Sequence, residues 1–295
     1  MATAAGEQMN GIAPVIMQNW VLVVSMLAAG LFSGFVAGMF GIGGGFVVVP
    51  ALAAVLGLLE QGHGKNVMHV AIGTSLATIF FTSLRSVQAH AKRGAVDWNI
   101  LKGWLPSIAA GVILGVVLTK FMDGTALKMV FGLFVGVMGL HFLFPVLANK
   151  KAAEEKMPKG PIRAALGGGL GTMSSLLGIG GGTPAVLIMT WNGVQIHRAV
   201  ATAAGFGTII AVPGALGNVI AGWGESDLPV GSLGFVNLIA LAAIVVMSFF
   251  TAPLGVAAAH NLDPNKLKKI FGGYLILTSA FMLKDSITAM FFAHH

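Results

Sequence analysis

Two glycine clusters are the segments of this sequence best suited to binding a ligand. Residues 41–45 and 178–182 share the sequence Gly-Ile-Gly-Gly-Gly, and each cluster interrupts a long apolar stretch. Glycine disfavours a helix by about 1 kcal/mol relative to alanine and permits positive φ, so we expect a helix to break at each cluster. Such a break leaves backbone N–H groups free at the start of the next helix, where the helix dipole favours anions. The clusters therefore predict an anion site.

Hydroxyl side chains near the clusters extend this candidate site. Thr74 and Thr202 occupy matching places after the first and the second cluster, and Ser75 follows Thr74 directly. The predicted binding residues are Gly41, Gly43, Gly44, Gly45, Phe46, Thr74, Ser75, Gly178, Gly180, Gly181, Gly182, Thr183 and Thr202. The alternative for the hydroxyls is hydrogen bonding within or between helices.

Single glycines elsewhere in the chain have a simpler interpretation. Membrane helices use small residues to approach each other closely, roughly one per turn. This interpretation is favoured for five glycines outside the clusters: Gly30, Gly34, Gly38, Gly132 and Gly136. Three consecutive glycines exceed what close packing requires, so the clusters keep the binding interpretation.

The elements that must position these residues are membrane helices. The chain of 295 residues is 56% hydrophobic and only 9% charged, whereas about 25% of the residues of a soluble domain are charged. No charged residue lies between Glu7 and Glu60, although about 20 apolar residues suffice to span a bilayer. The apolar runs are continuous, which excludes the alternating pattern of a membrane barrel. We therefore expect an all-α polytopic membrane protein.

Apolar segments fall into two sets of five, separated by a charged linker at residues 148–163. The expected segments are 20–40, 46–59, 67–84, 101–118 and 126–147, followed by 164–177, 183–191, 199–221, 235–259 and 270–292. Beyond the glycine clusters, Asp123 and Phe131 match Asp263 and Phe271 at one constant offset. We predict two repeats, residues 20–147 and 164–292, each with a broken or re-entrant helix pair and three transmembrane helices.

The distribution of Lys and Arg predicts that the two repeats are inverted. Short cytoplasmic loops are enriched in basic residues. If each glycine-broken pair enters and leaves on one side, the repeats are inverted and the outer face holds only Lys65, Lys120, Lys128 and Lys284 of the 17 basic residues. If each pair crosses instead, the repeats are parallel and the outer face exchanges Lys284 for Arg198, Lys266, Lys268 and Lys269. Inverted repeats thus place the linker in the cytoplasm and residues 1–19 outside the cell.

Several functional classes are disfavoured by what the sequence lacks. There is no cysteine, no nucleotide-binding loop, no metal-ligand spacing and no hydrolase triad, so we expect neither enzyme activity nor a cofactor or metal. Basic residues in short loops orient the protein and do not indicate nucleic acid. No carboxylate lies deep in an apolar segment, which favours an anionic substrate over a cation. His141 is the candidate proton relay, with a neutral hydrogen-bonded histidine as the favoured alternative.

The residues around the first cluster resemble a known family. Gly41-Ile-Gly-Gly-Gly-Phe-Val-Val-Val-Pro50, Ala71-Ile-Gly-Thr-Ser-Leu76 and His90-Ala-Lys-Arg-Gly-Ala-Val-Asp97 are similar to the sulfite exporter TauE/SafE family. The resemblance spans nearly the whole chain. It implies export of sulfite, sulfoacetate or a related sulfonate, without specifying which. One departure is that Ala203 follows Thr202, whereas Ser75 follows Thr74, so the two half-sites need not contribute equally.

The resulting functional prediction is a secondary transporter in a cytoplasmic membrane, that is, a bacterial inner membrane or a plasma membrane. It would bind a small anion at the midplane of the lipid bilayer, with proton coupling left open, and alternate access by movement of the repeats. The alternatives are a channel-like facilitator, an importer and, from another class, a membrane subunit or intramembrane enzyme. The sequence pattern predicts no particular oligomeric state.

Overall fold

The computed structural model describes residues 20–40, 43–59, 65–144, 155–261 and 263–292. These residues form ten helices and one short hairpin. The elements of the first half are α2 (Trp20–Phe40), α3 (Gly45–Leu59), α4 (Val67–Lys92), α5 (Trp98–Phe121) and α6 (Gly124–Leu143). Those of the second half are α7 (Gly160–Leu177), α8 (Gly182–Trp191), α9 (Ile196–Ala221), β1 (Ser232–Leu233), β2 (Val236–Asn237), α10 (Leu238–Asn261) and α11 (Pro264–Phe292).

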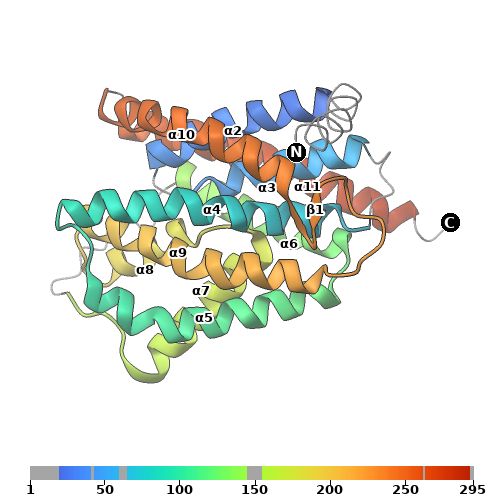
Figure 1. Cartoon of the computed structure of the whole chain (residues 1–295). Coiled ribbons are helices and arrows are strands. Elements are labelled where there is room, and N and C mark those ends of the chain that lie inside the picture. Colours follow the sequence, from blue (N-terminus) through green and yellow to red (C-terminus); the bar gives the residue numbers. More distant parts are fainter. Residues whose placement is uncertain (1–19, 41–42, 60–64, 145–154, 262, 293–295) are drawn as a thin grey trace, which may run out of the picture.

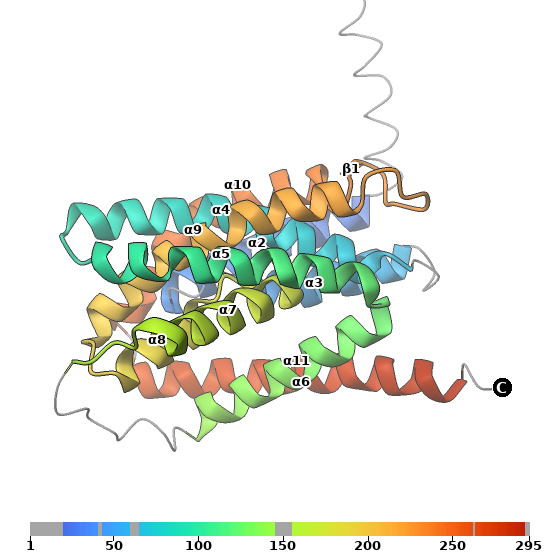
Figure 2. The ribbon, with the colours of Figure 1, turned by 90° about the horizontal axis from the view of Figure 1, so that it is seen from below.

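Helices α4 and α9 form the centre of the molecule. In Figure 1 they lie between α2 and α10 on one side and α5 and α7 on the other. Figure 2, viewed at 90° to Figure 1, shows α6 and α11 packed side by side along a further side. The short helices α3 and α8 point toward opposite ends of the bundle. Helices α4 and α9, which hold Thr74, Ser75 and Thr202, are therefore enclosed by other helices.

Five of the described helices are long and apolar enough to cross a membrane. They are α4, α5, α6, α9 and the Leu238–Gly255 part of α10. The most apolar stretch of α4 is 78% buried inside the protein and that of α9 is 61% buried, against 28% for α6 and for α10. This difference separates central helices from lipid-facing ones. The prediction of an all-α polytopic membrane protein is confirmed.

The packing of the helices pairs the two halves with each other. Helix α2 packs along α10, and its counterpart α7 packs along α5, which is the counterpart of α10. Helices α4 and α9 are antiparallel, because Gly73 lies beside Asn218 whereas Ser83 lies beside Thr208. Inverted copies require this arrangement. The duplication itself, the boundaries of the repeats and the side of the membrane on which the linker lies stay predictions.

The single glycines are packing residues, as interpreted from the sequence. A methyl group added at Gly30 would lie 2.9 Å from the Ile244 Cα of α10, and Gly34 and Gly38 contact the same helix. Gly132 and Gly136 make equivalent contacts with α11, at Leu283 and Ser279. Close approach of backbones is how helices associate within a bilayer, where the hydrophobic effect does not drive them together.

Several predicted boundaries differ from the structure. Helix α4 continues to Lys92, beyond the predicted end at residue 84. The apolar segment ends earlier than the helix, since the last turns are polar. Helix α7 begins at Gly160 with Pro161 in its first turn, so it starts inside the predicted linker. Residues 235–237, predicted as part of a membrane segment, instead belong mainly to the hairpin before α10, where β1 and β2 pair antiparallel.

Candidate functional site at the two helix breaks

The chain leaves the helical conformation at both glycine clusters. Gly43 and Gly44 have φ of 76° and 75°, and Gly44 precedes the first residue of α3. Gly178 ends α7 with φ of 65°, and Gly181 precedes α8 with the same φ. Side chains with a Cβ rarely adopt these conformations, so glycine is required there. The predicted breaks are present, although Gly41 itself lies outside the described residues.

The two breaks lie against each other. A methyl group added at Gly45 would stand 2.5 Å from the carbonyl oxygen of Gly178 and 2.9 Å from the Ile179 Cα. A methyl group at Gly178 would stand 2.9 Å from Val49 of α3. Gly45 and Gly178, which are 133 positions apart, therefore meet through their backbones, and only glycine permits the approach.

Helix α4 passes along both breaks. The Ser75 hydroxyl donates to the carbonyl oxygen of Gly178 at 2.7 Å. One turn further, the Ile79 side chain would contact a methyl group at Gly43 at 3.7 Å and one at Gly180 at 3.1 Å. Ile79 is fully buried. One helix thus supplies a hydroxyl that fixes the second break and an apolar side chain that lies against both.

Thr74 and Thr202 bind the backbone of the opposite half. The Asn237 N–H at the start of α10 donates to Thr74 Oγ1 at 2.8 Å, and the Asp97 N–H before α5 donates to Thr202 Oγ1 at 2.9 Å. Both threonines are fully buried. Each hydroxyl therefore holds the start of a helix, and contact of either one with a substrate stays a prediction.

Two buried hydroxyls flank the second break without a protein partner. They belong to Ser174 on α7 and Thr183 in the first turn of α8. A methyl group at Gly181 would lie 2.8 Å from Ser174 Oγ. Thr183 is one of the predicted site residues, whereas Ser174 is missing from that set. Its place four residues before Gly178 is the only sequence signal that could have indicated it.

Phe46 lies in an aromatic cluster beside the first break. Its ring stacks on Phe134 with centroids 6.5 Å apart and meets the Phe271 ring edge to face at the same distance. The Tyr274 hydroxyl donates to the carbonyl oxygen of Phe46 at 3.5 Å. Phe46 is 1% exposed. The aromatic cluster gives the Phe46 side chain a packing role. Its contact with a substrate stays a prediction.

His141 lies in the last turn of α6, half-buried and edge-on to the Phe142 ring. His141 is therefore on a different helix from those that adjoin the glycine breaks. The described residues hold no group of three or more His, Asp or Glu side chains arranged to bind a metal. A proton relay through His141 stays a prediction.

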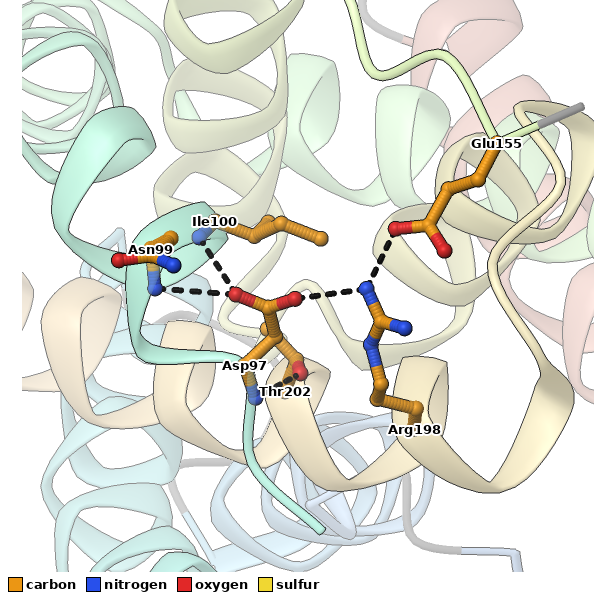
Figure 3. Close-up of polar contacts among 6 residues, drawn as sticks. All are labelled: Asp97, Asn99, Ile100, Glu155, Arg198 and Thr202. Carbon is orange, nitrogen blue, oxygen red and sulfur yellow. Dashed lines mark hydrogen bonds and ion pairs between the residues drawn. The ribbon is translucent and has the colours of Figure 1, made fainter.

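A charged network joins α5, α9 and the end of the linker (Figure 3). Asp97 Oδ1 accepts hydrogen bonds from the Asn99 and Ile100 amides, both at 3.0 Å, and so caps α5. Arg198 donates to Asp97 Oδ2 at 2.7 Å and also to Glu155. Burial acts to raise the pKa of Asp97, but the amide bonds and the Arg198 charge outweigh it and lower the pKa overall. The network lies at the end of the bundle that is predicted to face the cytoplasm.

Comparison with known proteins decides the family. The family model described as "Sulfite exporter TauE/SafE" matches residues 26–282. The chain belongs to the sulfite exporter TauE/SafE family. The TauE/SafE match includes both glycine breaks, α4 and α9, and ends within α11. The resemblance inferred from the sequence is confirmed.

Relatives of this chain carry transporter names. A "Probable membrane transporter protein" of Haemophilus influenzae is 33% identical over 88% of this chain and 97% of its own length. A protein of the same description from Methanocaldococcus jannaschii is 25% identical over 89% of this chain and 96% of its own. Bacillus subtilis YunE is 26% identical over 90% of this chain and 98% of its own length. No solved structure gave a significant match. The protein is a multi-pass membrane transporter of the TauE/SafE family.

Proposed function

We propose that this protein is a secondary transporter that exports a small sulfur-containing anion, such as sulfite, sulfoacetate or a related sulfonate, across the cytoplasmic membrane. The family name supports sulfite-like anions as the substrate class. The absence of charged residues between Arg163 and Arg198, around the second break, supports binding by neutral donors. No nucleotide-binding loop is present in the sequence, so the gradient of the substrate or of protons supplies the energy.

The observation that carries this proposal is the contact between the two glycine breaks. Both have positive-φ glycines before a short helix, and Gly45 of the first lies against Gly178 of the second. Non-helical backbone at membrane depth is tolerated where protein surrounds it or where it lines a cavity. The start of α3 therefore lies beside the loop that leads into α8, and an anion bound there between the two halves would be close to the positive end of a short helix.

The close packing of the breaks favours alternating access over an open channel. Ile79 lies against both breaks, and a methyl group does not fit between Gly45 and Gly178 without displacing backbone. An anion that passes this point requires the two halves to separate. A transporter with two conformations provides such separation, whereas a channel requires a continuous opening.

Counterflow in liposomes tests the substrate class and the mechanism together. Vesicles with the purified protein would be loaded with unlabelled sulfite, sulfoacetate, taurine or sulfate and mixed with the labelled compound. We expect transient accumulation of labelled sulfite or sulfoacetate, because a carrier exchanges one bound anion for another. Protein-free vesicles and vesicles with Gly181→Val serve as controls.

Other outcomes would replace the proposal with its alternatives. Rapid equilibration without counterflow would indicate a channel-like facilitator. Counterflow together with net uptake by the vesicles along an imposed proton gradient would indicate an importer. No movement of any of the four compounds would remove the proposed substrate class.

A further inference from the structure

Among the described residues, most buried hydroxyls have a hydrogen-bond partner. Thr78, Thr119 and Ser286 each donate to the carbonyl oxygen four residues earlier, at 2.8 to 2.9 Å. Ser174 and Thr183 are the exceptions among the buried hydroxyls of the described residues. Leaving a buried polar group unpaired costs about 1–3 kcal/mol, so two such groups in one place require a reason.

The two hydroxyls flank one loop. Ser174 is fully buried and Thr183 is 6% exposed, and they lie on either side of the glycines that join α7 to α8. Ser174 Oγ would be 2.8 Å from a methyl group at Gly181, so this hydroxyl is directed at the start of α8. Thr183 itself belongs to the first turn of α8, so both unpartnered hydroxyls lie at the start of this helix.

The start of α8 adds backbone donors at the same place. Its capping residue is Gly181, which has no side chain to accept from the first amides. The first backbone hydrogen bond of the helix runs from Ala185 N to Gly181 O at 2.9 Å, and Pro184 has no N–H. The Gly182 and Thr183 amides therefore precede the hydrogen-bonded part of α8 and lie at the positive end of its dipole.

The corresponding places at the first break carry apolar side chains. A methyl group at Gly44 would lie 3.6 Å from Ala37 Cβ, the place that Ser174 takes beside Gly181. Phe46 follows Gly44 by two residues, as Thr183 follows Gly181. Ser33 is also close to Gly44, but it lies one turn earlier on α2 and is not among the unpartnered hydroxyls.

We propose that the second break alone binds the oxyanion, through the Ser174 and Thr183 hydroxyls and the first amides of α8, whereas the first break forms an apolar wall. This inference rests on the function proposed above and specifies which half of the site recognises the charged group. A sulfite or sulfonate group has three acceptor oxygens and one or two negative charges, which two hydroxyls and two amides can satisfy. A cation is disfavoured here, because the two amides can only donate and the two hydroxyl oxygens are neutral acceptors.

The test measures binding and transport in single variants. Titration calorimetry of the purified full-length protein would use sulfite and sulfoacetate, with chloride and acetate as comparison anions. We expect Ser174→Ala and Thr183→Val each to weaken sulfite or sulfoacetate binding at least about tenfold, because each removes a hydrogen bond to a charged ligand. Thr183→Ser retains the hydroxyl and should stay within about threefold of wild type.

Two control variants separate hydroxyl loss from general damage. Thr190→Val removes a hydroxyl from the same helix α8, but one that already donates to Val186 O at 2.8 Å. Ser33→Ala removes the hydroxyl near the first break. Both should bind as wild type does, and size-exclusion profiles would show that all variants remain folded. Should Thr183→Val fail to fold, Thr183→Ala tests the same hydroxyl.

The outcomes distinguish this inference from the proposed function. If wild type binds and transports the anion and the Ser174 and Thr183 variants do so equally well, the inference is wrong and the proposed function stands. If Ser33→Ala weakens binding and Ser174→Ala does not, the anion lies at the first break and the inference is also wrong. If wild type neither binds nor transports any sulfur anion, the proposed function fails and this assignment fails with it.

Discussion

The two glycine breaks share a backbone and differ in their side chains. In each, a positive-φ glycine precedes a short helix whose first hydrogen bonds return to that glycine, from Val47 and Val48 to Gly44 and from Ala185 to Gly181. The side chain two residues later is Phe46 in the first break and Thr183 in the second. Backbone conformation at such a site tolerates only glycine, whereas neighbouring side chains are free to change. At this place the first break therefore has an apolar side chain that packs, and the second has a polar one.

The two ends of the central helices give a second comparison. Thr74 holds the start of α10 and Thr202 holds the start of α5 with the same kind of hydrogen bond. Asp97 at one end bonds Arg198, whereas Asn237 at the other end bonds the neutral groups Val230 O and Ser232 Oγ. Both ends share a hydrogen bond from a backbone N–H to a threonine hydroxyl. The end with Asp97 also has an ion pair.

The largest effect is expected from valine in either break. Gly44→Val and Gly181→Val should each reduce transport by more than about 100-fold, because a β-branched residue resists positive φ and displaces the site. A Cβ at Gly44 would lie 2.5 Å from Ser33 Oγ, and one at Gly181 would lie 2.6 Å from Ile210 Cδ1. Counterflow measures the loss.

Gly57→Ala in α3 and Gly169→Ala in α7 are matched controls, because no atom lies within 4 Å of a methyl group added at either position. They should transport normally. Normal transport by both valine variants would show that the breaks are not part of the path.

Opposite labelling of the two ends of the bundle is expected if the repeats are inverted. Single cysteines would replace Ser226, near the hairpin, and Lys159, just before α7, in this cysteine-free chain. In whole cells, an impermeant maleimide should label Ser226→Cys fully and Lys159→Cys only after the membrane is opened. Labelling of both from one face would contradict the inverted arrangement.

Equal and moderate effects are expected from Thr74→Val and Thr202→Val. Each leaves a buried backbone N–H without its acceptor, which should lower the free energy of unfolding by about 1–3 kcal/mol. Thermal unfolding in detergent measures this loss. Similar losses in both variants would support equivalent roles, whereas a loss in only one would break the comparison between the two ends. Thr190→Val should have a smaller effect, because the Thr190 hydroxyl donates a hydrogen bond and its loss leaves no backbone N–H without an acceptor.

A smaller, pH-dependent effect is expected from Asp97→Asn, which copies the neutral residue of the other end. The pKa of Asp97 is lowered in the folded protein, so its charge stabilises the fold above the unfolded pKa of about 3.9. This contribution is lost as the pH falls through the folded value. Wild type should therefore lose thermal stability in acid more steeply than Asp97→Asn does.

Solvent screening keeps this effect small, because the Arg198 side chain is 37% exposed. Asp227→Asn removes the same charge from an exposed loop and serves as the control. An acid-induced loss that is unchanged in Asp97→Asn and reduced in Asp227→Asn would place the sensitivity at the other end of the molecule.

The smallest effect is expected from His141→Gln. His141 is half-buried in the last turn of α6, where its ring meets Phe142 edge to face. The variant should keep most of its transport, with a pH dependence that follows ionisation of the substrate. Proton-driven uptake and anion exchange in the same vesicles measure the two activities. Loss of the first with retention of the second would show that His141 is a proton relay.

The sequence by itself determined the class of fold and the position of the breaks. A chain with uncharged, mostly apolar runs such as residues 20–59 is suited to a bilayer, where helices satisfy the hydrogen bonds of its backbone. The glycine clusters act locally, since a residue without a Cβ changes the conformations open to its own backbone. These properties need no knowledge of distant contacts, so the helices and their interruptions could be predicted.

Only the tertiary structure decided which of the predicted residues meet and what their polar groups bind. Gly45 meets Gly178, Ser75 binds Gly178, and Thr74 binds the start of α10, which is more than 160 residues away. It also decided that Ser175 has partners on α5 and α7 whereas its neighbour Ser174 has none. Adjacent serines look alike in the sequence. A helix nevertheless turns each residue by about 100° from the one before, so the two serines face different neighbours. Hydrogen-bond partners are set by packing between helices, and that packing is a property of the assembled bundle.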